Sequence, residues 1–244
     1  MAQNIYDDQG FFNQYIQLPR QVKGLDGTPE WPALKSLMPE LKSSTFLDLG
    51  CGFGWVCRWA RENGAIAVQG VDVSENMLSK ARSFPPDAAT TYTRADLENF
   101  ELPASVYDIV FSSLSFHYLK NLPSLILEIF KTLKPGGALV FSVEHPIFTA
   151  PRNPKFVSDS DGQMVWPLDG YLKEGPRTTN WLADGVVKQH RTISTYVTIL
   201  LQAGFTLSAV EEWGPTPDQI KESPQWADEL KRPPFLLLKV VKAM

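Results

Sequence analysis

Apolar and polar positions alternate in blocks through the middle of this chain. Runs of strand length, rich in apolar or β-branched residues, occupy residues 45–49, 65–71, 90–94 and 138–143. Between two of them, Ser74 is a candidate N-cap for a helix that follows at once. Strands that alternate with helices predict an α/β fold, with a parallel sheet covered by helices on both faces.

The alternation continues toward the C-terminus. One apolar helical face runs through residues 122–133. Residues 193–203 predict a further helix, and residues 205–210 and 235–241 predict two further strands.

Two regions fall outside this pattern. The first 44 residues hold aromatic clusters broken by prolines, and residues 146–189 form a long stretch with frequent Pro and Gly. Loops of this length in compact domains are usually lids or binding elements. Within the second region, Asp184-Gly185 stands between apolar pairs and predicts a two-residue hairpin turn.

Three glycines at alternate positions follow the first predicted strand. Gly50, Gly52 and Gly54 lead directly into a helical pattern. Glycine permits a sharp turn and close approach of the backbone to a ligand, and a helix N-terminus offers unpaired N–H groups. This unit predicts a cradle for a nucleotide or cofactor. A dinucleotide-binding turn has a further glycine where this chain has Trp55, which disfavours a dehydrogenase.

Acidic residues stand at the ends of the next two strands. Asp72 follows the glycine turn by about 20 residues, where a carboxylate can accept hydrogen bonds from both hydroxyls of a ribose. Asp96 follows the third strand, where a carboxylate can accept a hydrogen bond from the exocyclic amine of an adenine. Three such strand ends in order are a much stronger signal than a glycine turn alone.

These segments resemble class I S-adenosylmethionine-dependent methyltransferases, and most closely the small-molecule branch that includes the ubiquinone/menaquinone-biosynthesis methyltransferases. The likeness runs from about Leu47 to His145. Its five motifs are the glycine turn (47–54), the ribose-binding strand end (71–74), the adenine-side acid (95–97), a fourth-strand motif (107–118) and the turn into a fifth strand (133–139). The resemblance implies a doubly wound, seven-stranded, mostly parallel Rossmann-like sheet whose last strand runs antiparallel.

The resemblance also implies S-adenosyl-L-methionine as the cofactor and S-adenosyl-L-homocysteine as the product. Asp48 would hold the methionine ammonium, and Tyr15 and Arg20 could reach the cofactor carboxylate from an N-terminal lid. The other residues expected to bind the cofactor are Gly50, Cys51, Gly52, Gly54, Asp72, Val73, Met77, Ala95, Asp96, Leu97, Ser113 and Leu114.

We therefore expect a single methyltransferase domain over residues 1–244. Its parts would be an N-terminal helical cap (1–44), a cofactor-binding core (45–145), a substrate-covering insertion after the fifth strand (146–190) and the C-terminal part of the sheet (191–244).

The sequence of a methyltransferase need not contain a dedicated catalytic acid or base. Methyl transfer from a sulfonium is an in-line displacement with an activated leaving group, and orientation alone can contribute roughly 7–11 kcal/mol. If the acceptor is a hydroxyl, His117 and His145 are candidate bases, although each could instead cap a helix or orient a loop. His190 is more readily explained as structural. The candidate substrate contacts are Trp166, Tyr171 and Trp181 of the insertion, which could equally form a small core of their own.

Composition narrows the possible partners. The 244 residues carry a net charge of −4, which disfavours tight binding of nucleic acid. No apolar stretch approaches the roughly 18 residues of a membrane span, and the first ten residues show no secretory signal. The two cysteines, Cys51 and Cys57, predict no metal site. A reduced, cytoplasmic setting is expected.

The main prediction is a methyltransferase that acts on a small-molecule acceptor, as a monomer or homodimer. A catalytically silent S-adenosylmethionine-binding sensor or partner subunit is the alternative. Unbroken cofactor motifs and long covering segments favour the enzyme. Whether an oxygen, nitrogen, sulfur or carbon atom is methylated stays open.

Overall fold

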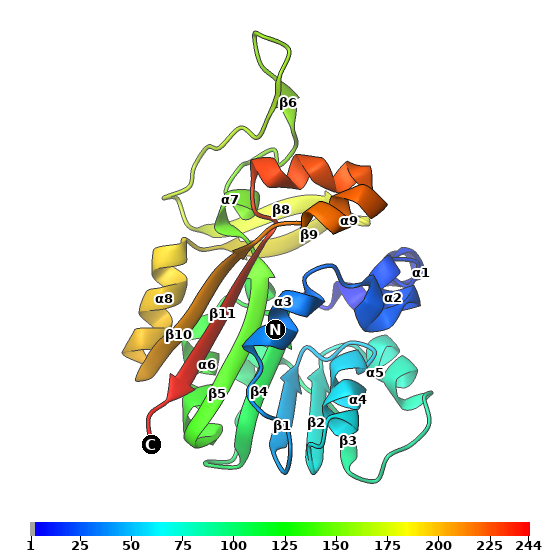
Figure 1. Cartoon of the computed structure of the whole chain (residues 1–244), viewed down its shortest axis with the longest axis vertical. Helices are drawn as coiled ribbons and strands as arrows, with labels where there is room; N and C mark the ends of the chain where they lie inside the picture. Colours follow the sequence, from blue (N-terminus) through cyan, green and yellow to red (C-terminus); the bar gives the residue numbers. More distant parts are fainter. Residues whose placement is uncertain (1–2) are drawn as a thin grey trace.

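The computed structural model describes residues 3–244. Seven strands form one sheet in the order β10-β11-β5-β4-β1-β2-β3 (Figure 1). Their bounds are β1 Thr45–Leu49, β2 Ala67–Asp72, β3 Thr90–Arg94, β4 Tyr107–Ser113, β5 Leu133–Glu144, β10 Phe205–Trp213 and β11 Phe235–Lys242. Strand β11 is antiparallel to both of its neighbours, and the other pairs are parallel. The predicted fold class and the antiparallel last strand are confirmed.

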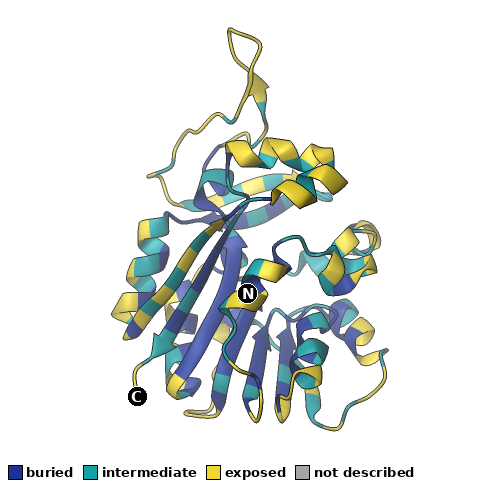
Figure 2. Ribbon diagram, in the orientation of Figure 1, coloured by how far each residue is buried: buried dark blue, intermediate teal, exposed yellow. Residues whose placement is uncertain are grey.

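The alternation of side chains along the strands divides the core into two layers. In β1, Leu47 and Leu49 point to one face of the sheet and Phe46 points to the other. The first face is covered by α6 (Leu122–Thr132) and α8 (Ile193–Gln202), and the second by α3 (Trp31–Leu37), α4 (Trp55–Glu62) and α5 (Glu75–Arg82). The central strands are therefore buried on both sides (Figure 2).

Local signals set the helix ends. The Ser74 hydroxyl accepts the Met77 backbone N–H at 3.2 Å and caps α5 as predicted. Gly54 is left-handed at the start of α4, and Gly204 takes φ +100° just after α8. These are backbone conformations that other residues adopt at a cost.

Strand β5 begins earlier than its apolar run predicts. Leu133 pairs with Tyr107, and the ladder resumes only where Ala138 pairs with Ile109. Residues 134–137 bulge between these two pairs. Because the chain enters the sheet at Leu133, α6 ends one residue before it.

The N-terminal region has two parts. The 3-10 helix η1 (Ile5–Asp7), α1 (Gln9–Tyr15) and α2 (Pro19–Val22) lie beyond the carboxyl ends of β1 to β3 (Figure 1). After η2 (Gly24–Gly27), α3 packs against a face of the sheet because Trp31 and Leu34 are buried there. Of residues 1–44, the first two lie outside the described part, and only the segment up to α2 covers the edge.

The insertion also has two parts. After α7 (Pro146–Thr149), β6 (Val157–Ser158) and β7 (Met164–Val165) form an exposed finger that projects away from the sheet (Figures 1 and 2). The hairpin of β8 (Gly175–Trp181) and β9 (Ala183–His190) instead lies over the carboxyl edge.

The turn of this hairpin is not at Asp184-Gly185, so that prediction was wrong. Trp181 pairs with Ala183, and Leu182 between them makes the turn with φ +58°. Asp184-Gly185 forms a bulge opposite Asn180, whose side-chain oxygen accepts the Gly185 N–H at 3.4 Å. Gly185 has a positive φ. A glycine with positive φ is common in a β-bulge as well as in a hairpin turn.

A third covering segment follows β10. The helices α9 (Pro217–Glu222) and η5 (Pro224–Lys231) lie above the same edge of the sheet as the hairpin (Figure 1). The sequence reading assigned this stretch to the sheet and missed its covering position. Across residues 3–244, none of the helices has the length and apolar character needed to cross a membrane.

Candidate functional site

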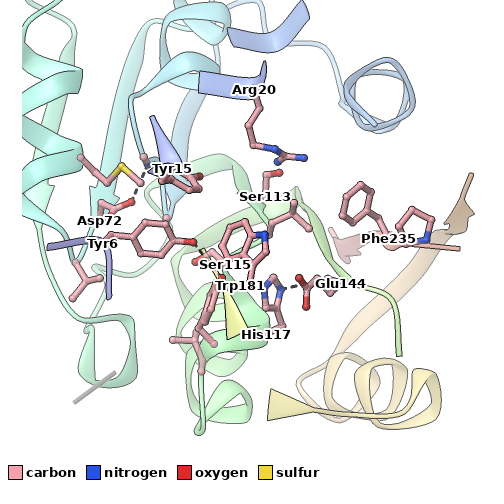
Figure 3. A pocket seen from close by; sticks show the side chains of 18 of the residues that line it. Tyr6, Tyr15, Arg20, Asp72, Ser113, Ser115, His117, Glu144, Trp181 and Phe235 are labelled. Atoms are coloured by element: carbon pink, nitrogen blue, oxygen red, sulfur yellow. Dashed lines mark hydrogen bonds between the residues drawn. The ribbon is translucent and has the colours of Figure 1, made fainter. Parts of the chain in front are cut away.

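A cavity of about 340 Å³ lies at the carboxyl edge of the sheet (Figure 3). The strand ends and the loops after them contribute Gly50, Gly52, Asp72, Val73, Met77, Asp96, Leu97, Ser113, Leu114, His117 and Glu144. The covering segments contribute Tyr6, Tyr15, Arg20, Phe148, Trp181, Trp226, Arg232 and Phe235. Ligands of open α/β sheets bind at this edge.

The backbone of the glycine turn can lie close to a ligand. Gly50, Gly52 and Gly54 have φ values of +80°, +52° and +69°. A side chain at Gly50 would meet Ser115, and one at Gly54 would meet Tyr92. A side chain at Gly52 would meet nothing within 4 Å. Gly52 therefore presents bare backbone to open space in the cavity, whereas Gly54 is not in the lining and serves the packing of the turn.

Asp72 joins the turn to the start of α5. Its two carboxylate oxygens accept the backbone N–H groups of Gly52 and Ser74, each at 2.9 Å. Burial raises the pKa of Asp72 to about 6, and these hydrogen bonds oppose the rise. Each carboxylate oxygen can accept a further hydrogen bond, so the group can still bind a ligand hydroxyl.

Asp48 lies deeper, on a smaller cavity that adjoins the first and shares Gly50 and Gly52 with it. Its carboxylate accepts a hydrogen bond from the Cys57 thiol at 3.5 Å. Burial raises the pKa of Asp48 to about 7. Cys51 also lines the smaller cavity. Among residues 3–244, no group of His, Cys, Asp or Glu side chains is arranged to hold a metal ion.

The third strand end supplies another wall of the cavity. Asp96 and Leu97 line it together with Val73 and Met77 from the neighbouring strand end and helix. The Asp96 side chain accepts the Glu98 backbone N–H at 3.1 Å and so caps a short 3-10 helix, η3 (Leu97–Asn99). Ala95 is partly buried against the core and does not line the cavity.

Two residues of the N-terminal region reach the same space. Tyr15 and Arg20 line both the main cavity and the smaller one. One guanidinium nitrogen of Arg20 binds both oxygens of the buried Glu30, at 3.0 and 3.2 Å. The Tyr15 hydroxyl accepts a hydrogen bond from Gln21 at 3.0 Å.

The first described residues tie two sides of the cavity together. The Gln3 side chain makes two hydrogen bonds of 2.9 Å with the backbone of β9. Asp7 accepts hydrogen bonds from the Ser74 hydroxyl at 2.6 Å and from the Asn76 N–H at 3.1 Å, at the start of α5. Between them, the Tyr6 hydroxyl donates to that of Tyr118 at 3.2 Å. Residues 3–8 therefore form a strap that links α5 to the β8–β9 hairpin.

Comparisons with known proteins agree with this geometry. A family profile described as "Methyltransferase domain" matches residues 47–141. A solved S-adenosylmethionine-dependent methyltransferase from Mesorhizobium loti is 49% identical, with a TM-score of 0.87 over 90% of this chain and 100% of that one. The chain belongs to the S-adenosylmethionine-dependent methyltransferases.

Other relatives extend the comparison. A structure from Listeria monocytogenes is 37% identical, with a TM-score of 0.81 over 89% of this methyltransferase and 99% of that chain. An uncharacterised protein of Haemophilus influenzae is 35% identical over 98% of this chain and 97% of its own length. The malonyl-[acyl-carrier protein] O-methyltransferase of Enterobacter lignolyticus is 36% identical, but over only 45% of this chain and 43% of that protein.

As a member of this family, the methyltransferase uses S-adenosyl-L-methionine as its cofactor, and the residues of the cavity fit that molecule. Gly52 leaves open space where a side chain would stand. Asp72 and Asp96 place carboxylates at successive strand ends on the same cavity. Hydroxyl, amine and ammonium groups of the cofactor all need such acceptors.

His117, one candidate base, lies in the cavity wall and is only 2% exposed. Its Nδ1 accepts the Glu144 backbone N–H at 3.3 Å, so the neutral ring carries its proton on Nε2. Burial lowers the pKa of His117 to about 4. The ring is thus a neutral N–H donor at physiological pH, and this arrangement opposes a role as general base.

His145, the other candidate base, does not line the cavity and takes the structural role that was its alternative. It is fully buried and caps α7, where its Nδ1 accepts the Ile147 N–H at 3.0 Å. Its Nε2 lies 2.9 Å from a Glu212 oxygen. Both ring nitrogens are occupied by structural hydrogen bonds, so this arrangement opposes a catalytic role for His145. His190, which also bonds at both nitrogens, is structural as expected.

Of the three candidate substrate contacts, only Trp181 lines the cavity. Trp166 stacks on Phe148 at 5.6 Å between ring centres and lies behind it, with its indole N–H bound to a backbone carbonyl. Tyr171 packs on His190 at 5.8 Å. Trp166 and Tyr171 are both only partly buried and pack outside the cavity, each against different neighbours.

Several lining residues were not predicted from the sequence. Glu144 comes from the end of β5, and its carboxylate binds the buried Lys188 of β9 at 2.5 Å. Arg232 binds Glu229 through two nitrogens, at 2.6 and 3.2 Å. Tyr6, Trp226 and Phe235 complete the wall. A charged residue at the end of a predicted central strand, as at Glu144, was the one sequence feature that could have pointed to this part of the site.

Proposed function

We propose that this methyltransferase transfers the methyl group to a small-molecule acceptor held between the strand ends and the covering segments. One observation carries the proposal: a single cavity is lined on one side by the glycine turn, Asp72 and Asp96, and on the other by aromatic residues of three covering segments. Such a space suits a cofactor and a small second reactant, with water excluded from between them.

The cofactor side follows from the polar groups present. We assign Asp72 to the ribose hydroxyls, Asp96 with Leu97 to the adenine, and Asp48 to the methionine ammonium. Arg20 and Tyr15 would bind the methionine carboxylate. The other proposed contacts are Gly50, Cys51, Gly52, Val73, Met77, Ser113 and Leu114, which line the two adjoining cavities.

When bound, the cofactor supplies a methyl group on a positively charged sulfur. The residues of the chain orient the two reactants and exclude water, which can contribute roughly 7–11 kcal/mol to the rate. The Tyr6, Trp181 and Phe235 side chains face this space and would form the wall against which the acceptor packs (Figure 3).

Two measurements test the proposal. Titration calorimetry should show binding of S-adenosyl-L-homocysteine and no binding of NAD. Formation of S-adenosyl-L-homocysteine from S-adenosyl-L-methionine should then depend on a member of a metabolite library. Cofactor binding without turnover on any small molecule would favour the silent binding protein.

A further inference from the structure

We propose that the acceptor presents an uncharged or cationic group with an N–H or O–H bond, and not a carboxylate, and that Glu144 takes its proton. This inference rests on the proposed function and names the chemistry of its acceptor. It follows from the charges in the cavity wall, from one unpartnered oxygen and from the state of His117.

The guanidinium groups in the wall are each paired with a carboxylate. Within the described residues, Arg20 and Arg232 are the two guanidinium side chains in the lining, and they bind Glu30 and Glu229. We assign Arg20 to the cofactor, and Arg232 keeps one buried N–H, on Nε, without a partner. A carboxylate acceptor could accept this one hydrogen bond but would share the cation with Glu229, and burying a charge that is only partly compensated is costly.

The acidic side chains of the same wall offer an anion no compensation. They are Asp72, Asp96, Glu144 and Glu229. We assign the first two to the cofactor. Glu144 and Glu229 are each paired with one cation, so the wall beside the acceptor has no net positive charge, and an amine or a hydroxyl is accommodated there at a lower cost than a carboxylate.

Glu144 has an unused acceptor. Its Oε1 binds Lys188, whose ammonium lies 5.0 Å from the centre of the Trp181 ring. Its Oε2 is buried and has no hydrogen-bond partner. A buried carboxylate oxygen without a donor is costly, and an N–H or O–H group of the acceptor would satisfy it.

His117 does not compete for the proton. Its Nδ1 already accepts a backbone N–H, and its Nε2 therefore carries hydrogen. Among the ionisable groups that face this side of the cavity, Glu229 accepts hydrogen bonds from Arg232 at both oxygens, and the Tyr6 and Tyr118 hydroxyls bond to each other. Glu144 is the remaining proton acceptor in the described lining.

Bonds, electrons and protons balance in the proposed methyl transfer. A cationic nitrogen first gives one N–H proton to Glu144, which frees its lone pair, whereas a neutral amine or hydroxyl already has one. This lone pair forms the bond to the methyl carbon, and the electron pair of the broken carbon–sulfur bond stays on sulfur as a neutral thioether. A neutral acceptor gives its N–H or O–H proton to Glu144 as the bond forms. In either case Glu144 takes up one proton, becomes a carboxylic acid and later releases the proton to water.

Fragment binding tests the acceptor class without turnover. Benzylamine, phenol and benzoate share one ring size, and ligand-observed NMR would compare them with the protein saturated by S-adenosyl-L-homocysteine. We expect benzylamine and phenol to bind at least about tenfold more tightly than benzoate, a difference of 1.4 kcal/mol. A preference for benzoate would overturn the inference.

One variant tests Glu144 itself. Glu144→Gln should abolish the fragment preference and, with the natural acceptor, lower kcat by about 100-fold or more with a small change in KM. Glu212→Gln is the matched control, because Glu212 binds His145 outside the cavity. Full activity of Glu144→Gln, or an equal loss in both variants, would contradict a proton transfer to Glu144.

The chemical stability of the labelled product tests the acceptor class independently. The protein would be incubated with methyl-tritiated S-adenosyl-L-methionine and the small-molecule fraction of a bacterial extract. We expect the labelled product to survive alkali, as ethers and N-methyl compounds do. Release of labelled methanol would identify a methyl ester and overturn this inference alone. Absence of any labelled product would overturn the small-molecule acceptor as well, and failure to bind S-adenosyl-L-homocysteine would overturn the cofactor assignments.

Discussion

Asp72 is a single side chain that serves both the fold and the site. Asp72→Ala removes the proposed acceptor of the ribose hydroxyls, whose charge-assisted hydrogen bonds are worth about 1.5–3 kcal/mol each. Titration calorimetry should show the affinity for S-adenosyl-L-homocysteine reduced roughly tenfold to several-hundredfold. An affinity within about twofold of the parent protein would show that Asp72 does not hold the ribose.

Asp72→Ala should also lower the stability of the fold. A strand-end position alone suggests little loss of stability, but Asp72 accepts the N–H groups of Gly52 and Ser74. Leaving such buried donors unsatisfied costs about 1–3 kcal/mol each. Asp72→Asn retains one acceptor oxygen and is the milder variant for separating stability from binding.

The raised pKa of Asp72 predicts a pH dependence of cofactor binding. Burial raises that pKa to about 6, and protonation removes the charge that strengthens the ribose hydrogen bonds. The contribution of Asp72 to the affinity should therefore be constant well above pH 6 and fall as the pH drops through it. Asp48, with a pKa of about 7, should cause a separate loss at higher pH that Asp72→Asn retains. The stability of the cofactor-free protein should change in the opposite sense, because protonation relieves a buried charge. Calorimetry and thermal melts from pH 5 to 8, on parent protein and Asp72→Asn, would check both directions.

The sequence predicted which residues line the candidate site where their direction depends on the local strand and turn. Gly50, Gly52 and Asp72 stand at strand ends, where the local pattern fixes their direction. His145 looked equivalent, but its partner Glu212 belongs to β10 and withdraws its ring from the cavity. Glu144 was missed because its importance depends on Lys188, which the hairpin brings from far along the chain.

At the level of elements, the β8–β9 hairpin forms one wall of the cavity through Trp181. Its ring lies 5.6 Å from Phe11 and 6.1 Å from Tyr15. Trp181→Ala should lower kcat/KM for the acceptor by about tenfold or more, since misplacement by an ångström can cost about 10²-fold. Affinity for S-adenosyl-L-homocysteine should change by only about twofold, as expected for a residue beyond the methyl group.

Trp166→Ala is the control for that experiment. Trp166 lies behind the cavity wall, so its loss should lower Tm and leave the acceptor KM nearly unchanged. Loss of cofactor affinity in Trp181→Ala, with an unchanged acceptor KM, would mean that the hairpin clamps the cofactor through Tyr15.

The strap of residues 3–8 predicts an effect on cofactor exchange. Asp7 makes its hydrogen bonds to the start of α5, next to Asp72. Asp7→Ala should speed dissociation of S-adenosyl-L-homocysteine by about tenfold, which corresponds to one net hydrogen bond of roughly 1.4 kcal/mol. Stopped-flow displacement would measure the rate, and hydrogen exchange would show whether the strap opens. An unchanged dissociation rate would mean that the cofactor leaves by another route.

Elements of the sheet were predictable because each has its own period of apolar residues. The covering elements were not, because their direction depends on contacts with other segments. The turn at Leu182 and the place of α9 and η5 above the edge are both of this kind. A sequence pattern can indicate that a segment lies outside the sheet without indicating which side of the molecule it covers.

For the whole molecule, cofactor binding should be visible as stabilisation. A ligand at about 100 times its Kd adds roughly 2.7 kcal/mol, which for a chain of this size is about 5–10 °C in Tm. Scanning fluorimetry should therefore show such a shift with S-adenosyl-L-homocysteine and none with NAD. A shift with NAD alone would return the dehydrogenase to consideration.

The position of β11 has a consequence for biosynthesis. This strand fills the gap between β5 and β10, and Leu236, Leu237 and Leu238 on it are fully buried. During translation, β5 therefore keeps an unpaired edge until residues 235–242 have left the ribosome. Unpaired edges promote aggregation. We therefore expect the nascent chain to need chaperones until this strand emerges and pairs with β5.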